Sequence, residues 1–196
     1  VRRAMQQEGF EVLKEEQIFH RYLTIIDRVV KYPNGKEVKF DVLTCPSNHF
    51  VTALAFFTST KQFAVIKEYF QGVNRIGSAI ACGRYEPSKH NSILHAAECE
   101  LSEECALKGG KWIKLIPDGH PGVIEAKWAA TRFTPFLVID PEEDENPLEK
   151  DEEEYMHREN VTLEQLEDLA FSGEMHLPSS QTVFMGLKYL RTNNLL

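Results

Sequence analysis

The order of the secondary-structure signals constrains the fold of this chain more than any other feature. Residues 22–32 and 36–44 are rich in β-branched and aromatic side chains, and they flank Asn34-Gly35, a strong signal for a β-hairpin turn. The more apolar stretches 50–58 and 62–70 predict a second pair of strands, which we expect to be buried on both faces. Residues 1–20 have a mixed character that favours a helix or a loop.

The second half of the chain contains the helix signals. A helix is predicted from about 92 to 107, with Ser92 or Asn91 as its N-cap and Gly109-Gly110 ending it. Residues 72–87, before this helix, are expected to be irregular. Strands are predicted at 112–116 and at 126–140, the latter interrupted or finished near Pro135, and an acidic loop follows. Helices are predicted from a capping box at Thr162 to about 172, and from Ser179 or Ser180 to about 191. This order predicts an α+β or mixed α/β sandwich.

Charge and composition exclude several classes of protein. Residues 142–154 contain nine acidic residues and one basic residue, which accounts for the whole net charge of −8. No basic stripe remains for long nucleic acid, and no apolar run approaches the roughly 20 residues of a membrane helix. The chain shows no signal-peptide pattern and no C-x-x-C pair among its four cysteines. We therefore expect a cytoplasmic, reducing location.

The predicted helix at 92–107 carries three carboxylates on one face. Glu100, Glu103 and Glu104 lie within about 100° of one another at helical spacing. Like charges so placed repel each other, unless a bound cation neutralises them. Magnesium and manganese favour carboxylate oxygen and share coordination with phosphates, so this face is a candidate site for Mg²⁺ or Mn²⁺. The structural alternative is a solvated acidic helix face.

This stretch resembles the Nudix box, G-x5-E-x7-R-E-U-x-E-E-x-G-U, where U is a bulky aliphatic residue. Residues 100–107 fit its second half, with Ala106 in the place of the glycine, and Ala81-Cys82-Gly83 resembles the Pro-Ala-Gly that opens the box. The resemblance spans about residues 20–191, including the hairpin and Pro121-Gly122. It points to the ADP-ribose and nucleoside-diphosphate-sugar branch of the family, and to a plant-type member acting on GDP-mannose.

The chain also departs from the box. Cys99 stands where the family has an arginine that steadies the catalytic glutamates, and the spacing from Gly83 to Cys99 is two residues longer than in the family. The first glutamate of the box has no clear equivalent. These departures weaken the transfer of activity from the family to this chain.

The resemblance implies a Nudix-type α/β/α sandwich with a mixed sheet and an N-terminal β-hairpin region. It implies a β-rich region at 1–48, which we expect to help form a homodimer, and a Nudix hydrolase domain at 49–196. The implied activity is metal-dependent cleavage of a nucleoside diphosphate linked to X, such as GDP-mannose or ADP-ribose, to a nucleoside monophosphate and X-phosphate.

The candidate site residues come from four segments of the chain. Glu100 and Glu104 would be metal ligands, Glu103 a third ligand or a general base, and the carbonyl of Cys82 would complete the metal shell. Within the acidic run, Glu152 is our choice for the catalytic base. Arg84 and Glu125 are candidates for substrate contact, with Glu125 also a weaker candidate for the base.

Other constellations in the sequence carry no full motif. His95 and Cys99, with Cys82 nearby, are a candidate zinc site, for which ordinary helix packing is the alternative. Trp112 and Trp128 are candidates for stacking on a nucleobase, although tryptophans in strands are more often core residues.

Two functions from other classes stay open. A Nudix-fold protein with an impaired site would bind nucleotides or regulate without hydrolysing them, and Cys99 motivates that alternative. An acidic interaction scaffold would use residues 142–154 to bind a partner, and deleting them should then abolish partner binding.

Overall fold

The chain divides into two compact units. The computed structural model describes residues 9–150 and 155–196. One unit comprises the chain up to Asn48 together with Ile124–Thr131, and the other comprises His49–Val123 and Arg132–Leu196. The segment 124–131 therefore leaves the second unit and joins the first, where an isolated bridge connects Leu43 with Ala129.

The first unit is an antiparallel sheet of β1 (Glu11–His20), β2 (Thr24–Lys31) and β3 (Glu37–Thr44), in that order. The hairpin predicted at Asn34-Gly35 is confirmed. Gly35 adopts a φ of 82°, and the Asn34 side chain accepts a hydrogen bond from the Lys36 amide at 3.0 Å. Such a turn needs a residue that tolerates positive φ, which explains the glycine.

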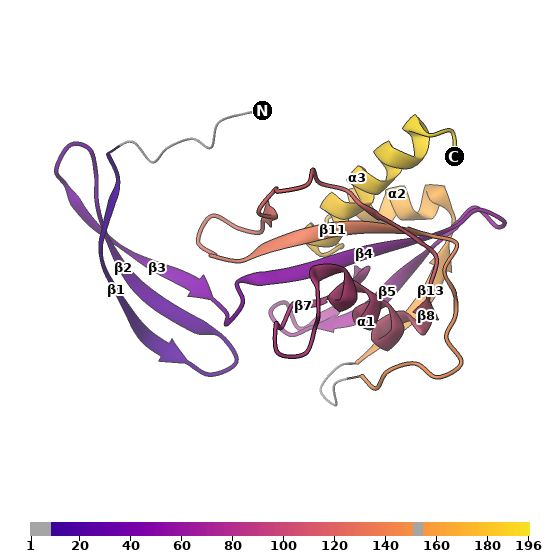
Figure 1. The fold of residues 1–196 in the computed structure, drawn as a ribbon, viewed down its shortest axis with the longest axis horizontal. Helices are drawn as coiled ribbons and strands as arrows, with labels where there is room; N and C mark the ends of the chain where they lie inside the picture. The colour runs from indigo at the N-terminus through magenta and orange to yellow at the C-terminus, as the bar shows by residue number, and fades with distance from the viewer. Residues whose placement is uncertain (1–8, 151–154) are drawn as a thin grey trace. The chain divides into compact units, whose positions relative to one another are not determined.

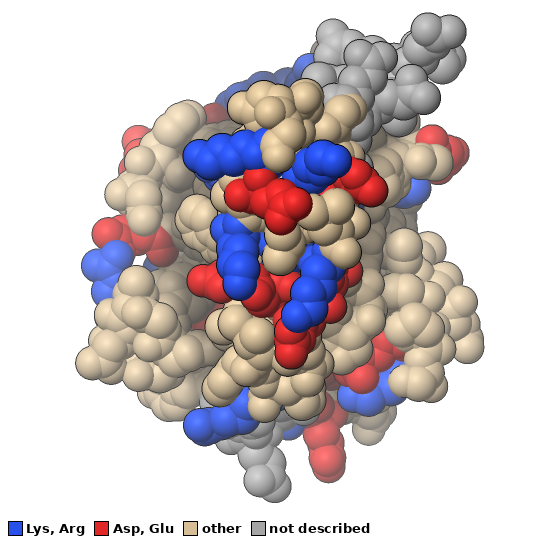
Figure 2. Space-filling model, turned by 90° about the vertical axis from the view of Figure 1, so that its left-hand side faces the viewer, with Lys and Arg blue, Asp and Glu red and all other residues tan. Residues whose placement is uncertain are grey.

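Strand β1 corrects the prediction of a helix or loop in residues 1–20. All of its residues are exposed, so no one-sided apolar pattern marked it as a strand; its pairing with β2 defines it instead. Ion pairs cross this sheet, including Arg28–Glu15 at 2.6 Å. On the face drawn in Figure 2, basic and acidic side chains are interspersed, and neither sign gathers alone.

The second unit is built on a mixed sheet. Its main path runs β10-β11-β4-β5-β13, with β6 paired to β5, β7 to β4 and β9 to β11. Strand β11 lies parallel to β4, whereas β5 and β7 are antiparallel to it. The bounds are β4 (His49–Phe57), β5 (Gln62–Phe70), β6 (Arg75–Ala79), β7 (Ala81–Arg84), β9 (Lys111–Lys114), β10 (Val123–Ile124), β11 (Arg132–Ile139) and β13 (Met156–Val161). A two-stranded ribbon joins β8 (Leu107–Lys108) to β12 (Glu142–Glu143).

Strands β4 and β5 diverge, and beyond the point of divergence β7 pairs with β4 and β6 pairs with β5. Strand β4 pairs with β5 only over residues 55–57, and residues 50–53 pair with β7 instead. The prediction that 72–87 is irregular is therefore wrong. Glycine and polar residues dilute the strand pattern there, and long-range pairing supplies what local propensity lacks.

Helices cover both faces of this sheet (Figure 1). Helix α1 (Ile93–Cys105) packs on the side of Ala53, Ala55 and Ala81, while α2 (Leu163–Phe171) and α3 (Leu177–Thr192) pack on the side of Leu54 and Phe56. Successive strand residues point to opposite faces, so one strand serves both layers. The predicted three-layer α/β/α sandwich with a mixed sheet is confirmed.

The helix ends differ in part from expectation. Ser92 caps α1 by accepting the His95 amide at 3.0 Å, and both bonds of the predicted capping box are present at Thr162. The predicted end at Gly109-Gly110 is wrong, because α1 ends at Cys105 and its C-cap is Ala106, with φ 52°. Helix α3 begins before the predicted cap, with Pro178 in its first turn. Within the described residues, no helix is both long and apolar enough to cross a membrane.

Two further boundaries are corrected. Strand β11 continues through Pro135 to Ile139, because parallel pairing with β4 runs along its whole length. Ser179 and Ser180, predicted as caps of α3, are buried inside the helix instead. The Ser179 hydroxyl accepts a hydrogen bond from the Ile80 amide at 3.3 Å, which ties α3 to the link between β6 and β7.

Candidate active site

Helix α1 is bound to strand β7 through Glu104. The Cys82 amide donates a hydrogen bond to Glu104 Oε2 at 2.7 Å, and Glu104 is only 6% exposed. A carboxylate this deep is expensive to bury unless it is hydrogen-bonded, and here a backbone N–H meets it. The helix therefore presents Glu104 inward to the sheet instead of to solvent.

Glu100, one helical turn earlier, packs against Gly83. A methyl group built on Gly83 would overlap the Glu100 carboxyl group. Glycine at this strand position thus provides the space in which the second carboxylate lies, as expected where a glycine in a strand marks a close approach. Two of the three predicted metal ligands are brought to one short strand, at consecutive residues.

Small side chains allow the helix to come this close. Ala96 and Ala97 on α1 and Ala81 on β7 are buried in one cluster between helix and sheet. Alanine fills little space, so the backbones approach and a glutamate side chain can span the remaining gap. The physical role of the pair Ala96-Ala97 is this close packing.

The Cys82 carbonyl points toward the same edge of β7 as the Cys82 amide, because both groups of one strand residue face the same neighbour. That edge faces α1, since the amide binds Glu104. The placement is compatible with the predicted role of this carbonyl beside Glu100 and Glu104. Glu103 lies half-buried on α1.

The donor atoms suit a hard cation. Among residues 9–150 and 155–196, no three His, Cys, Asp or Glu side chains converge closely enough to hold a metal ion. Magnesium in phosphate-processing sites binds through one or two carboxylates, keeps several waters and takes further oxygens from the substrate. Two carboxylates and a backbone carbonyl at one strand edge fit that pattern, and they do not fit zinc, which prefers a closed set of nitrogen and sulfur ligands.

Cys99 does not form a reactive pair with His95. The two side chains approach to 3.6 Å, between Sγ and Nε2. His95 Nδ1 accepts the Asn91 amide at 3.2 Å, so the neutral ring carries its proton on Nε2 and donates toward sulfur. Burial, followed by the charges of Glu103 and Glu100, raises the pKa of the Cys99 thiol. Burial and the neighbouring carboxylates thus disfavour a thiolate nucleophile at Cys99.

A zinc site using Cys82 together with His95 and Cys99 is also disfavoured. Ala81 and Gly83 face α1, and strand residues alternate, so the Cys82 side chain points to the opposite face of the sheet. Its neighbour across the strand pair, Thr52, meets Thr182 of α3 at 2.6 Å between the two hydroxyl oxygens.

The remaining predicted residues lie elsewhere. Arg84 is half-buried at the end of β7, opposite Phe50 of β4. Glu125 belongs to the first unit, where its carboxylate accepts a hydrogen bond from the Thr131 hydroxyl. Glu152 lies outside the described residues.

The two tryptophans differ in their surroundings. Trp112 is half-buried, packs edge-on against Phe136 and donates to the Gly109 carbonyl at 3.0 Å. Trp128 is 65% exposed and belongs to the first unit. Trp112 thus packs against the core, which argues against a role in base stacking.

Comparison with known proteins supports the fold. No protein-family model matches the sequence, and no curated protein matches it. The structure is similar to a crystal structure of an ADP compounds hydrolase, with a TM-score of 0.77 and 17% sequence identity, covering 96% of this chain and 97% of that chain. This likeness shows that the chain has the fold of Nudix-type hydrolases, as the resemblance implied. Activity has to be argued from the residues of the site.

Proposed function

We propose that this chain is a metal-dependent pyrophosphohydrolase that cleaves a nucleoside diphosphate linked to a second moiety, X. The observation that carries the proposal is the contact of both glutamates with β7. Glu104 accepts a hydrogen bond from the Cys82 amide, and Glu100 packs against Gly83. Acidic residues on a solvated helix face would extend into water; these two turn toward the sheet. The similarity in fold to an ADP compounds hydrolase supports the same reaction class.

In the proposed reaction, Glu100, Glu104 and the Cys82 carbonyl would hold Mg²⁺ or Mn²⁺. When bound, such an ion would neutralise charge on the diphosphate and make water a better nucleophile. Water oxygen bonds to one phosphorus atom while the bridging P–O bond breaks. The products are a nucleoside monophosphate and X-phosphate, and the proton of the attacking water passes to a carboxylate.

Two residues are proposed as that proton acceptor. Glu103 lies on the same helix as the metal-binding glutamates, one residue before Glu104. Glu152, in the acidic run, is the alternative suggested by the resemblance. Glu103→Gln and Glu152→Gln would separate them, since loss of the base should flatten the rise of kcat with pH and loss of a surface carboxylate should not.

The comparison and the resemblance together support two candidate substrates. ADP-ribose is the first candidate because the structural neighbour acts on ADP compounds, and GDP-mannose is the second. We also propose a homodimer formed through the N-terminal strands, which light scattering of the purified chain would test at a range of concentrations.

The decisive experiment measures nucleotide release from ADP-ribose and a panel of nucleoside-diphosphate sugars, with Mg²⁺ or Mn²⁺. Glu104→Gln keeps an oxygen that can accept the Cys82 amide but loses the charge, so folding should survive and kcat/KM should fall at least about 100-fold. Glu98→Gln on the exposed side of α1 is the matched control. Equal activity of the two variants would sink the proposal.

A nucleotide-binding protein without hydrolysis is the second candidate. It is favoured by Cys99 at the position of the box arginine, a neutral side chain one residue from Glu100. Calorimetry that detects ADP-ribose binding, without release of product by any panel member, would select it. Cys99→Arg should then be the first variant tested for restored turnover.

A further inference from the structure

The first half of the acidic segment is bound to the last turn of α1. Strand β12 (Glu142–Glu143) pairs with β8 (Leu107–Lys108), which directly follows the helix. The next residue, Asp144, donates its amide to the Ala106 carbonyl at 2.8 Å. Residues 142–148 are therefore attached to the helix that carries the carboxylates, although most of their side chains remain exposed.

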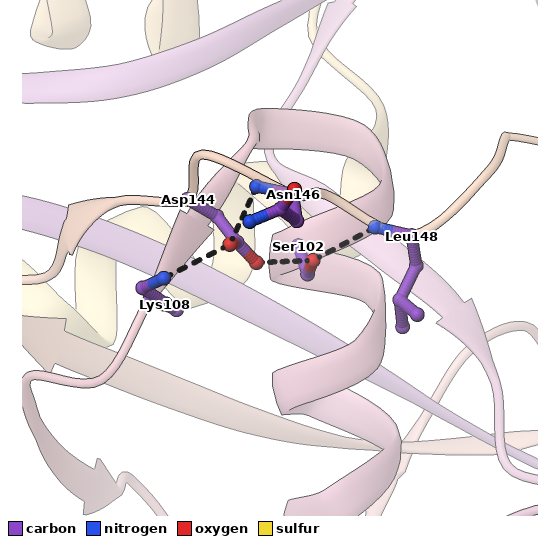
Figure 3. Close-up of polar contacts among 5 residues, drawn as sticks. All are labelled: Ser102, Lys108, Asp144, Asn146 and Leu148. Atoms are coloured by element: carbon purple, nitrogen blue, oxygen red, sulfur yellow. Dashed lines mark hydrogen bonds and ion pairs between the residues drawn. The ribbon is translucent and has the colours of Figure 1, made fainter.

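Asp144 is the centre of this attachment (Figure 3). The Ser102 hydroxyl donates to Asp144 Oδ2 at 2.9 Å and accepts the Leu148 amide at 3.1 Å. Asp144 Oδ1 accepts from Lys108 Nζ at 3.1 Å and from the Asn146 amide at 3.2 Å. Ser102 is only 6% exposed, so its hydroxyl needs these partners. The hydrogen bond from Ser102, followed by that from Lys108, lowers the pKa of the Asp144 carboxyl group.

A second contact holds the same helix end. Arg158 of β13 donates to the Cys105 carbonyl at 2.7 Å and to both carboxylate oxygens of Glu143, at 3.1 and 2.7 Å. Helix α1 has no basic residue in its last turn. Arg158 and Lys108 thus supply the positive charge that favours a helix C-terminus.

These contacts lie across the helix from the strand that receives the glutamates. At 100° per residue, Ser102 lies about 160° around α1 from both Glu100 and Glu104. The helix is therefore held between two attachments. Cys82 and Gly83 receive the carboxylates, while residues 142–148, with Lys108 and Arg158, hold Ser102 on the opposite side and the carbonyls of Cys105 and Ala106 at the end of the helix. We call the second attachment the clamp.

We propose that the clamp sets the position of the metal-binding carboxylates and that Asp144 is its main positioning residue. The inference rests on the proposed function and adds a group that touches neither metal nor substrate. Outer groups that orient metal ligands typically contribute 10–100-fold to metal affinity or turnover. Asp144 qualifies because one side chain joins Ser102, Lys108 and the segment that follows.

The test compares Asp144→Ala, Asp144→Asn and Glu145→Gln in the full chain. Glu145 is exposed on the same segment and matches the change in charge. Asp144→Ala should raise the Mn²⁺ concentration at half-saturation and lower kcat about tenfold, with little change in KM for ADP-ribose. Asp144→Asn keeps an acceptor for Ser102 and should recover most of the loss, and Glu145→Gln should behave as wild type.

Hydrogen exchange provides a readout that does not need activity. The Cys82 amide bonds to Glu104, whereas the Leu54 amide lies in the centre of the sheet. In Asp144→Ala, exchange at Cys82 should accelerate several-fold more than exchange at Leu54. Equal acceleration at both amides, or none, would overturn the clamp, because a merely structural role acts on the whole unit.

The same design separates this inference from the proposed function. A wild-type chain that neither binds Mn²⁺ nor releases nucleotide refutes the proposed function, and the ratio of exchange rates still decides the clamp. Conversely, normal turnover and Mn²⁺ affinity in Asp144→Ala would refute the clamp and leave the hydrolase standing.

Discussion

The two faces of the sheet in the second unit are filled with side chains of different size. Toward α1 half of the buried residues are alanine, whereas toward α2 and α3 they are largely leucine, phenylalanine and valine. The alternation is visible within β4, where Ala53 and Ala55 face α1 and Leu54 and Phe56 face the other helices. The alanines buried on the first face are Ala53, Ala55, Ala64, Ala79, Ala81, Ala96 and Ala97.

This difference indicates that one face contributes mainly to the stability of the unit and the other mainly to the position of Glu104. A buried leucine or phenylalanine contributes roughly 1.5–3 kcal/mol of hydrophobic stabilisation, and an alanine far less. The α2–α3 face should therefore supply most of the stability of the unit. The α1 face gives up that gain, and the close approach places Glu104 within hydrogen-bonding distance of the Cys82 amide.

The largest effect on stability is expected from Leu187→Ala on the α2–α3 face. Leu187 is 2% exposed, and removing it leaves a cavity that should lower the free energy of unfolding by about 2–5 kcal/mol. Turnover per folded molecule should stay unchanged, because the α1 face is intact. Urea unfolding and active-site titration would measure the two quantities, and a loss of turnover without loss of stability would contradict the division.

Two glycines permit a matched comparison of the faces. Gly83→Ala adds a methyl group against the end of the flexible Glu100 side chain, and Gly186→Ala adds one against Leu54. We expect Gly83→Ala to fold with nearly normal stability and to lose about 100-fold in kcat, because misplacement of a reacting group by about 1 Å has that effect. Gly186→Ala should lower stability by about 1–3 kcal/mol through overpacking, with normal kcat.

Steady-state kinetics and thermal unfolding of both glycine variants check this pair. The comparison fails if both variants lose stability equally, or if Gly83→Ala keeps full activity. An intermediate result for Gly83→Ala, with a raised requirement for Mn²⁺, would still locate the defect at Glu100.

Sequence reasoning recovered the parts of this fold that local rules determine. The hairpin at Asn34-Gly35, the capping box at Thr162 and the Ser92 cap each depend on side chains a few residues apart. The order of the elements predicted an α+β or mixed α/β sandwich, and the resemblance to the Nudix box implied its three layers. By contrast, β6, β7 and β1 were missed because their pairing partners, not their own residues, define them as strands.

The site was predicted in its residue types more than in its geometry. Helical periodicity placed Glu100 and Glu104 on one face, and the structure brings both to β7. The close contact between Gly83 and Glu100 and the proposed role of Asp144 were not predicted. A glycine in a strand is a recognisable signal of close approach, but Asp144 is 42 residues from Ser102, and no local pattern links them.

A smaller effect is expected at the end of α1, where Ala106 adopts φ 52°. A left-handed conformation is unfavourable by about 1–2 kcal/mol for residues with a side chain, and glycine is free of that strain. Ala106→Gly should therefore raise the free energy of unfolding by about 1 kcal/mol, after the greater flexibility of glycine in the unfolded chain is offset. Urea unfolding measures it, and a destabilised variant would refute the interpretation.

The smallest effect concerns pH and again belongs to the α1 face. His49, on the same side of β4 as Ala53, contacts Thr134 Oγ1 at 2.9 Å, and burial followed by the charges of Arg132 and Lys114 lowers its pKa. A histidine with a lowered pKa binds protons more weakly in the folded state than in the unfolded state. Its contribution to the free energy of unfolding is therefore present above pH 6.5, the usual pKa of histidine. That contribution is lost as the pH falls toward the pKa of the folded state.

The free energy of unfolding should accordingly decline between pH 7.5 and 5.5, and His49→Gln should decline less. Some slope should remain, because burial followed by the charge of His95 also lowers the pKa of His90. Urea titrations at four or five pH values would measure the slopes, with His157→Gln, on the exposed part of β13, as the control. A steeper slope in His49→Gln would mean that protonation of His49 stabilises the α1 face, and the sign of its effect would have to be reversed.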